Sequence, residues 1–317
     1  MTDLRDLDEE ELKLRLAAPP LKMMRLEISN LFALKPEKVG KFTNIFTGFM
    51  SFHNWLGKRN NPQHNLRGAV DNFKRERVNY RNDIADFLEM VGKNQTGKAV
   101  LSEVATSSQK VMVEPGKEPS VRPVSGEDAV HFAIPVRDGK GNLVTKEVPD
   151  ESHPGRMKDE EIMGTGKGSV GRIFFPTSVV SRASEPASKP DELMHHELVH
   201  AGRAMRGVER LFKLDADYDT VEEFFAIVLT NIYMSEKAKG GRIALRRDHN
   251  GHKELRHPER FLDNVQHIRL PPGSLLEILR KDQDKLWNAL VKIGPPNALF
   301  NPVRDWQTKR TEVLIDL

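Results

Sequence analysis

The sequence predicts an α+β fold, and three observations support this prediction. Stretches with apolar residues at helical spacing begin near residues 75, 190 and 273. Two short runs of β-branched and aromatic residues, at 111–113 and 170–176, are typical of strands. A His-Glu-x-x-His pattern at 196–200 lies within the second helical stretch. We therefore expect helices around a small sheet, with the chemistry on the second helix.

The composition of the chain excludes several functional classes. Its 317 residues carry 49 basic and 46 acidic side chains, a net charge of +3, so a purely electrostatic nucleic-acid binder is excluded and no specific nucleic-acid partner is expected. With no cysteine, disulfides, thiolate metal sites and cysteine nucleophiles are also excluded. Any bound metal must therefore be held by His, Asp or Glu.

The N-terminal region, 1–75, is predicted to be basic and mostly helical. Residues 12–80 hold thirteen Lys and Arg against four acids, a local net charge of +9. Within this region an amphipathic helix is expected from residues spaced by three and four, namely Phe42, Ile45, Phe46, Phe49, Phe52, His53 and Leu56. Two interpretations are open: the aromatic face packs on the main domain, or the region docks onto an acidic partner or a membrane surface.

The remaining elements divide into a main domain, 76–260, and a C-terminal helical extension, 261–317. The main domain is expected to start with a helix over 75–92, ended by Gly92, and a helix-to-strand passage over 99–113. A loop from Pro115 to Met163 with a strand at 131–136, a strand at 170–176 and a polar linker at 181–190 should follow. Helical structure is expected over 190–238, then a helix over 273–292 and a Pro-rich, partly irregular tail.

The His-Glu-x-x-His pattern is the informative motif. His196 and His200 are four residues apart, so on a helix their side chains leave the same face, about 40° apart. Pro190 suits the start of this helix and Gly207 its end. The functional interpretation is a pair of metal ligands; the alternative is two surface histidines on an amphipathic helix.

A third ligand is expected from the segment Val221-Glu222-Glu223-Phe224-Phe225. The helix that follows is apolar on nearly every side, and an ionised carboxylate entering it is costly unless it is paired or binds a metal. We select Glu223. The register leaves an alternative open: with Asp219 as N-cap, Glu223 is free to face a metal, whereas with Thr220 as N-cap, Glu223 is occupied by a capping box and Glu222 becomes the candidate.

HHELVHAGRAMRG followed by EEFFAIVLTNIY resembles the gluzincin-type zinc metalloproteases, in particular the bacterial type III effector metalloprotease family, and more distantly anthrax lethal factor. The resemblance covers roughly residues 80–255. It implies a zincin-like core, Zn²⁺ as the metal and Glu223, directly before Phe-Phe, as the third ligand. It also implies that Tyr218 donates to an oxyanion. An acid four residues after the ligand is absent here, since that position is Ile227.

The expected mechanism is metal-assisted hydrolysis of a peptide bond. Zn²⁺ on His196, His200 and Glu223 lowers the pKa of a bound water to about 7, and Glu197 accepts its proton and delivers it to the leaving amine. Tyr218 or His249 stabilises the oxyanion; for His249 the alternative is a solvated turn. The substrate is a protein, bound as an extended segment along an edge strand such as 170–176.

Two roles follow from this assignment, and a third is the alternative to it. The first is an effector or toxin secreted without a cleavable signal peptide and delivered to a target cell. The second is a cytoplasmic metalloprotease that regulates proteins of its own cell. The third is a non-catalytic interaction module that uses the basic N-terminal region.

Overall fold

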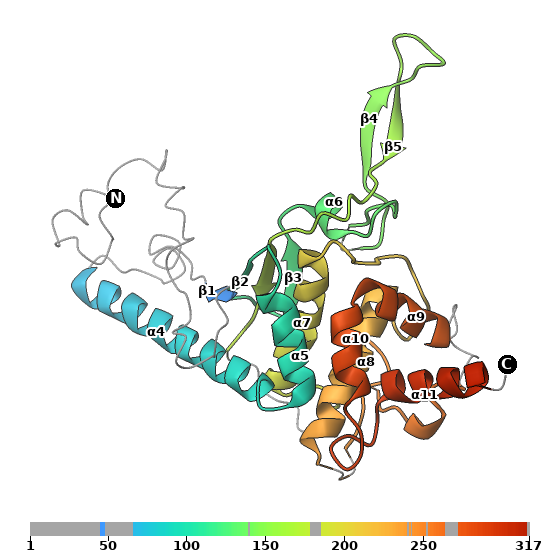
Figure 1. Ribbon diagram of the computed structural model, residues 1–317. Helices are drawn as coiled ribbons and strands as arrows, with labels where there is room; N and C mark the ends of the chain where they lie inside the picture. The colour runs from blue at the N-terminus through green and yellow to red at the C-terminus, as the bar shows by residue number, and fades with distance from the viewer. Residues whose placement is uncertain are drawn as a thin grey trace.

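A computed structural model describes residues 45–47, 66–138, 140–177, 185–239, 241, 243–251, 253–263 and 272–315. It shows an α+β architecture, which confirms the predicted class (Figure 1). A four-stranded sheet has the order β1 (Ile45–Thr47), β2 (Val111–Glu114), β6 (Gly171–Phe174), β3 (Ser120–Pro123). The first three strands are parallel, and β3 runs antiparallel to β6.

The expectation that 170–176 is an edge strand is wrong. In the sheet, Ile173 lies opposite Val113 on one side and Val121 on the other, so β6 is a central strand. An apolar run of this length indicates burial, and Ile173 is fully buried, but burial alone does not tell a central strand from an edge. The edge strand next to the motif helix is β3.

Two helices precede β2. Helix α4 (Leu66–Val91) starts nine residues before the predicted position and ends next to Gly92, and α5 (Gln95–Ala105) with β2 confirms the predicted helix-to-strand passage. The helix expected over residues 42–56 is wrong at Ile45–Thr47, which pair with β2 as a strand. Isoleucine, phenylalanine and threonine fit a pleated surface, and β2 offers unpaired backbone groups. The rest of that helix, and 1–44, lie outside the described residues.

The segment predicted as a long loop contains α6 (Gly126–Ala129) and a hairpin of β4 (Thr145–Pro149) and β5 (Met157–Glu161), which projects from the body as an arm (Figure 1). The sequence did not predict β4 and β5 because almost every residue in them is exposed, so they show no alternation of apolar and polar residues. The strand expected at 131–136 is wrong: the chain turns there, with Ala133 at a φ of 63°, and makes only isolated bridges.

Helices α7 (Pro190–Met205) and α8 (Val221–Lys237) pack against each other and are buried along most of their lengths. Helix α7 also contacts β3, β6, α4 and α5. It ends as predicted, because Gly207 has a φ of 68°, and a side chain there would meet the backbone of Gly166.

The C-terminal part differs from the single predicted helix. A short 3₁₀ turn, η3 (Pro258–Arg260), precedes α9 (Pro272–Asp282) and α10 (Asp284–Val291), which are separated at Gln283; α11 (Pro302–Ile315) occupies the tail expected to be irregular. Apolar side chains of these helices join the same hydrophobic core as α7 and α8. The three-part division of the chain stays a prediction. Among the described helices, none has the length and apolarity needed to cross a membrane.

Candidate metal centre

Helix α7 buries the motif residues in the interior of the protein. The exposed fractions of His196, Glu197 and His200 are only 5%, 6% and 8%. His195 points into the core, where its Nδ1 lies 3.1 Å from the Thr230 hydroxyl and its ring stacks on Tyr233. The motif histidines are therefore not two surface residues of an amphipathic helix.

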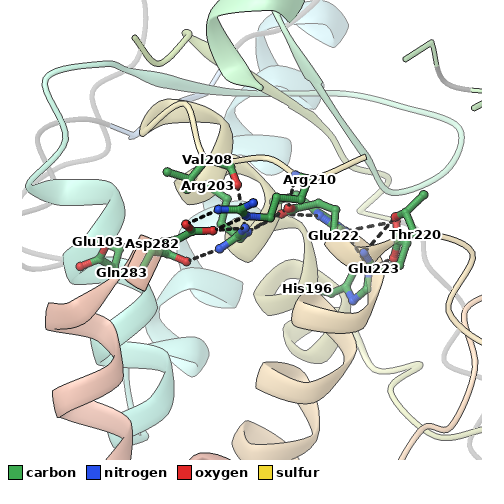
Figure 2. A network of polar contacts seen from close by, with 11 residues as sticks. Glu103, His196, Arg203, Val208, Arg210, Thr220, Glu222, Glu223, Asp282 and Gln283 are labelled. Carbon is green, nitrogen blue, oxygen red and sulfur yellow. Dashed lines mark hydrogen bonds and ion pairs between the residues drawn. The ribbon is translucent and has the colours of Figure 1, made fainter. Parts of the chain in front are cut away.

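Glu223, from the first turn of α8, meets both histidines. Its Oε2 lies 3.2 Å from His196 Nε2 and its Oε1 lies 3.4 Å from His200 Nε2, and the two Nε2 atoms are 3.1 Å apart (Figure 2 shows His196 and Glu223). We call these three residues the His–Glu cluster. Ligands bound to zinc at about 2.0–2.1 Å in a tetrahedron are about 3.3 Å from one another. The three donor atoms could therefore hold a metal ion.

The His–Glu cluster also contains buried polar atoms without a hydrogen-bond partner, namely Glu223 Oε2 and His196 Nδ1. Such atoms are rare in proteins, and each calls for an explanation.

Burial opposes charge on all three side chains of the His–Glu cluster. It lowers the pKa of His196 to about 3, whereas for His200 the nearby Glu223 and Glu222 outweigh burial and raise the pKa well above its usual value. The pKa of Glu223 stays well below its usual value, against burial, because of the adjacent His200 and His196.

The N-cap of α8 is Thr220, whose hydroxyl accepts a hydrogen bond from the backbone N–H of Glu223 at 3.2 Å. The expectation that this register would occupy Glu223 and leave Glu222 as the ligand is wrong. The cap uses only the backbone of Glu223, so its side chain remains free to face the histidines, as Figure 2 shows. Glu222 turns instead toward Arg203, 2.8 Å away.

Glu197 follows the first histidine and lies near enough to His200 and Glu223 to be influenced by their charges. Burial raises the pKa of Glu197 to about 7; His200 and Arg246 oppose this rise and Glu223 adds to it. A carboxyl group with a pKa near neutrality can both accept and return a proton.

His249 comes to the same place from the loop after α8. Its Nε2 lies 3.4 Å from Glu223 Oε2, and its ring is nearly parallel to that of His196 at a centroid distance of 6.5 Å. Asp219, with a φ of 60°, places its Oδ2 2.6 Å from His249 Nδ1 and so orients the ring. A buried Arg246 holds the loop by donating to the backbone carbonyls of Asp248 and His249.

Tyr218, by contrast, is placed in the core. Its ring packs edge-on against Phe224 at a centroid distance of 5.1 Å, and its backbone N–H donates to Asp215. Burial raises the pKa of the Tyr218 hydroxyl above its ordinary value. None of the contacts described for Tyr218 involves the His–Glu cluster. Its role as an oxyanion donor stays a prediction.

Two sets of residues around the His–Glu cluster are not predicted from the sequence. One is the pair Asp219 and Arg246, which orient His249. The other we call the arginine cluster, and it consists of Arg203, Glu222, Asp282 and Gln283. The only sign of the arginine cluster in the sequence is Arg203 itself, a charged residue among apolar ones on its helix. The partners of Arg203 lie up to 80 residues away in sequence.

Comparison with models of known protein families finds no match for this chain, and comparison with curated protein sequences finds none either.

Proposed function

We propose that the protein is a zinc-dependent endopeptidase with a zincin-like core. The observation that carries this proposal is the spacing of 3.1–3.4 Å among the three donor atoms of the His–Glu cluster, with Glu197 buried beside them. Two imidazoles and one carboxylate are a donor set that zinc accepts in catalytic sites. A zinc ion bound there supplies Lewis acidity, which acidifies a water molecule and polarises the scissile carbonyl.

The side chains of the chain have separate tasks in this reaction. Glu197 accepts a proton from the attacking water and later gives it to the leaving amine. His249, oriented by Asp219, donates from Nε2 to the oxygen that gains negative charge, and this proposal now rests on its position next to Glu223. The substrate binds in an extended form along β3, the edge strand that contacts α7.

The biological setting is part of the proposal. The resemblance of HHELVHAGRAMRG and EEFFAIVLTNIY to effector metalloproteases favours a secreted effector that acts on a target-cell protein. The second candidate is a non-catalytic interaction module; the projecting β4–β5 arm, with its exposed strands, is the observation that favours it.

The test compares zinc-loaded full-length protein with its Glu197→Gln variant. Each is added to a cell lysate, and new protein N-termini are identified by labelling. We expect new N-termini with the wild type, a rate lower by about 10²–10⁴-fold with Glu197→Gln, and one zinc per chain in both. Zinc bound without any cleavage would favour the interaction module. A chain that binds no zinc, or equal cleavage by both proteins, would overturn the assignment.

A further inference from the structure

Arg203 is the largest side chain that is fully buried in the described part of the protein. It follows His200 by three residues on α7, and its guanidinium lies 4.3 Å above the ring of Phe225. Its Nε donates to both carboxylate oxygens of Glu222, at 2.8 and 2.9 Å, and one terminal nitrogen donates to the backbone carbonyl of Val208 at 2.7 Å (Figure 2). A single N–H shared by both oxygens holds the position of this carboxylate, while the terminal nitrogens of the rigid guanidinium are bound elsewhere.

Glu222 connects Arg203 to the His–Glu cluster. Besides the guanidinium, it accepts a hydrogen bond from the backbone N–H of Arg210 at 3.2 Å. Its Oε1 lies 3.6 Å from His200 Nδ1, while the other ring nitrogen of His200 faces Glu223. A carboxylate that faces the second nitrogen of a ligating histidine fixes the orientation and the tautomer of the ring.

The other side of Arg203 is held by the junction between α9 and α10. Its second terminal nitrogen donates to Gln283 Oε1 at 2.8 Å, and Asp282 Oδ2 lies 3.4 Å from the guanidinium. Asp282 is in turn bound by Arg210 through two hydrogen bonds, and Gln283 reaches Glu103 on α5. The break at Gln283, which divides the single helix expected from sequence, puts both side chains next to Arg203.

We propose that Arg203 is a positioning residue for the metal ligand His200, and that the α9–α10 junction sets metal affinity through it. Asp282 and Gln283 hold Arg203, Arg203 orients Glu222, and Glu222 holds the His200 ring with Nε2 toward the metal. The proposal rests on the metal site put forward above. The C-terminal helices are thereby part of the support of the site.

A purely structural role for Arg203 makes a different prediction. If the guanidinium only satisfied buried acids, its loss would destabilise the fold without changing how well His200 binds a metal. Glu222 distinguishes the two roles because it is shared between the guanidinium and the ring of His200. Support of this kind typically changes metal affinity by about 10–100-fold.

The test measures zinc affinity of the full-length protein by competition with a chromophoric chelator. Arg203→Lys keeps the charge but removes the planar group, and we expect about 10-fold weaker zinc binding. Glu222→Gln should weaken binding similarly, and the double variant should be no weaker than Glu222→Gln alone. The matched control is Arg304→Lys, the same exchange in an ion pair of α11, where Arg304 donates to Asp305 at 2.8 Å; it should change affinity less than twofold.

Thermal unfolding of each metal-free variant verifies its fold. Should Arg203→Lys fail to fold, Asp282→Asn takes its place, with a smaller decrease in the same direction. Affinities of Arg203→Lys equal to those of the control, or losses that add in the double variant, would overturn this proposal and leave the metal site standing. A wild-type protein without zinc affinity would overturn both.

Discussion

Two buried polar clusters occupy neighbouring turns of α7, and they differ in how well their atoms are satisfied. In the arginine cluster the guanidinium donates to two carboxylates, an amide oxygen and a backbone carbonyl. In the His–Glu cluster, a carboxylate oxygen of Glu223 and the Nδ1 of His196 have no hydrogen-bond partner. Buried polar groups cost free energy when they are unpaired, so the protein itself satisfies the first cluster, whereas the donor atoms of the second could also hold a metal ion.

The same contrast separates two consecutive glutamates. Glu222 and Glu223 differ by about 100° on the helix, so one carboxylate enters each cluster. Glu222 is 2% exposed and paired with a cation, whereas Glu223 faces two histidines. Under the proposed assignment, loss of Glu223 removes a metal ligand, and loss of Glu222 removes the support of His200.

The largest expected effect follows from Glu223→Ala. It leaves two protein ligands, so zinc affinity should fall by more than the roughly 100-fold that bounds losses of outer support, and proteolysis should stop with it. Competition with a chelator measures the affinity. The metal-free variant should lose some stability, because Glu223 faces His196 and His200 at 3.2 and 3.4 Å, but less than a variant that leaves the buried Arg203 unpaired. Unchanged zinc binding would show that the third ligand is another residue, with His249, 3.4 Å from Glu223, as the next candidate.

Glu222→Ala should instead destabilise the fold. It leaves the buried Arg203 without its closest carboxylate, and breaking a buried ion pair in this way costs about 3–5 kcal/mol. For a protein of this size the melting temperature of the metal-free protein should drop on the order of 10 °C. With Asp219 as N-cap, the sequence alone would predict only the loss of a capping box between Asp219 and Glu222; the N-cap is Thr220, and the ion pair with Arg203 decides the effect instead. A drop no larger than that of Glu223→Ala would contradict the contrast between the clusters.

The smallest expected effect is that of His249→Ala, which tests how far the His–Glu cluster extends. As an oxyanion donor, His249 contributes to the rate and not to metal binding, so proteolysis should slow by about 100-fold with zinc affinity unchanged. Asp219→Asn, which keeps the shape of the orienting residue, should slow it less. Weaker zinc binding by His249→Ala would instead make His249 a fourth ligand.

The positions of some site residues could be predicted from the sequence and those of others could not, for physical reasons. That His196 and His200 lie together could be predicted because residues four apart share one helix face, and Glu197 follows from the motif that they form. Glu223 does face both histidines, and its role as a metal ligand stays a prediction; the capping argument against it treated a backbone hydrogen bond as if it engaged the side chain. Tyr218 was placed by resemblance alone, and the structure packs it on Phe224.

The sequence by itself determined the features that depend on local periodicity, namely the α+β class, α7 with its two ends, the presence of α8, and the pair of histidines on one helix face. Tertiary structure decided what depends on distant partners. It made β6 central, broke the C-terminal helix at Gln283 and brought Asp282 next to Arg203. The periodicity of apolar residues indicates which side of a helix or strand is buried, but not which other element packs against that side. Buried charges find their partners on that other element, so the sequence pattern alone does not predict how they pair.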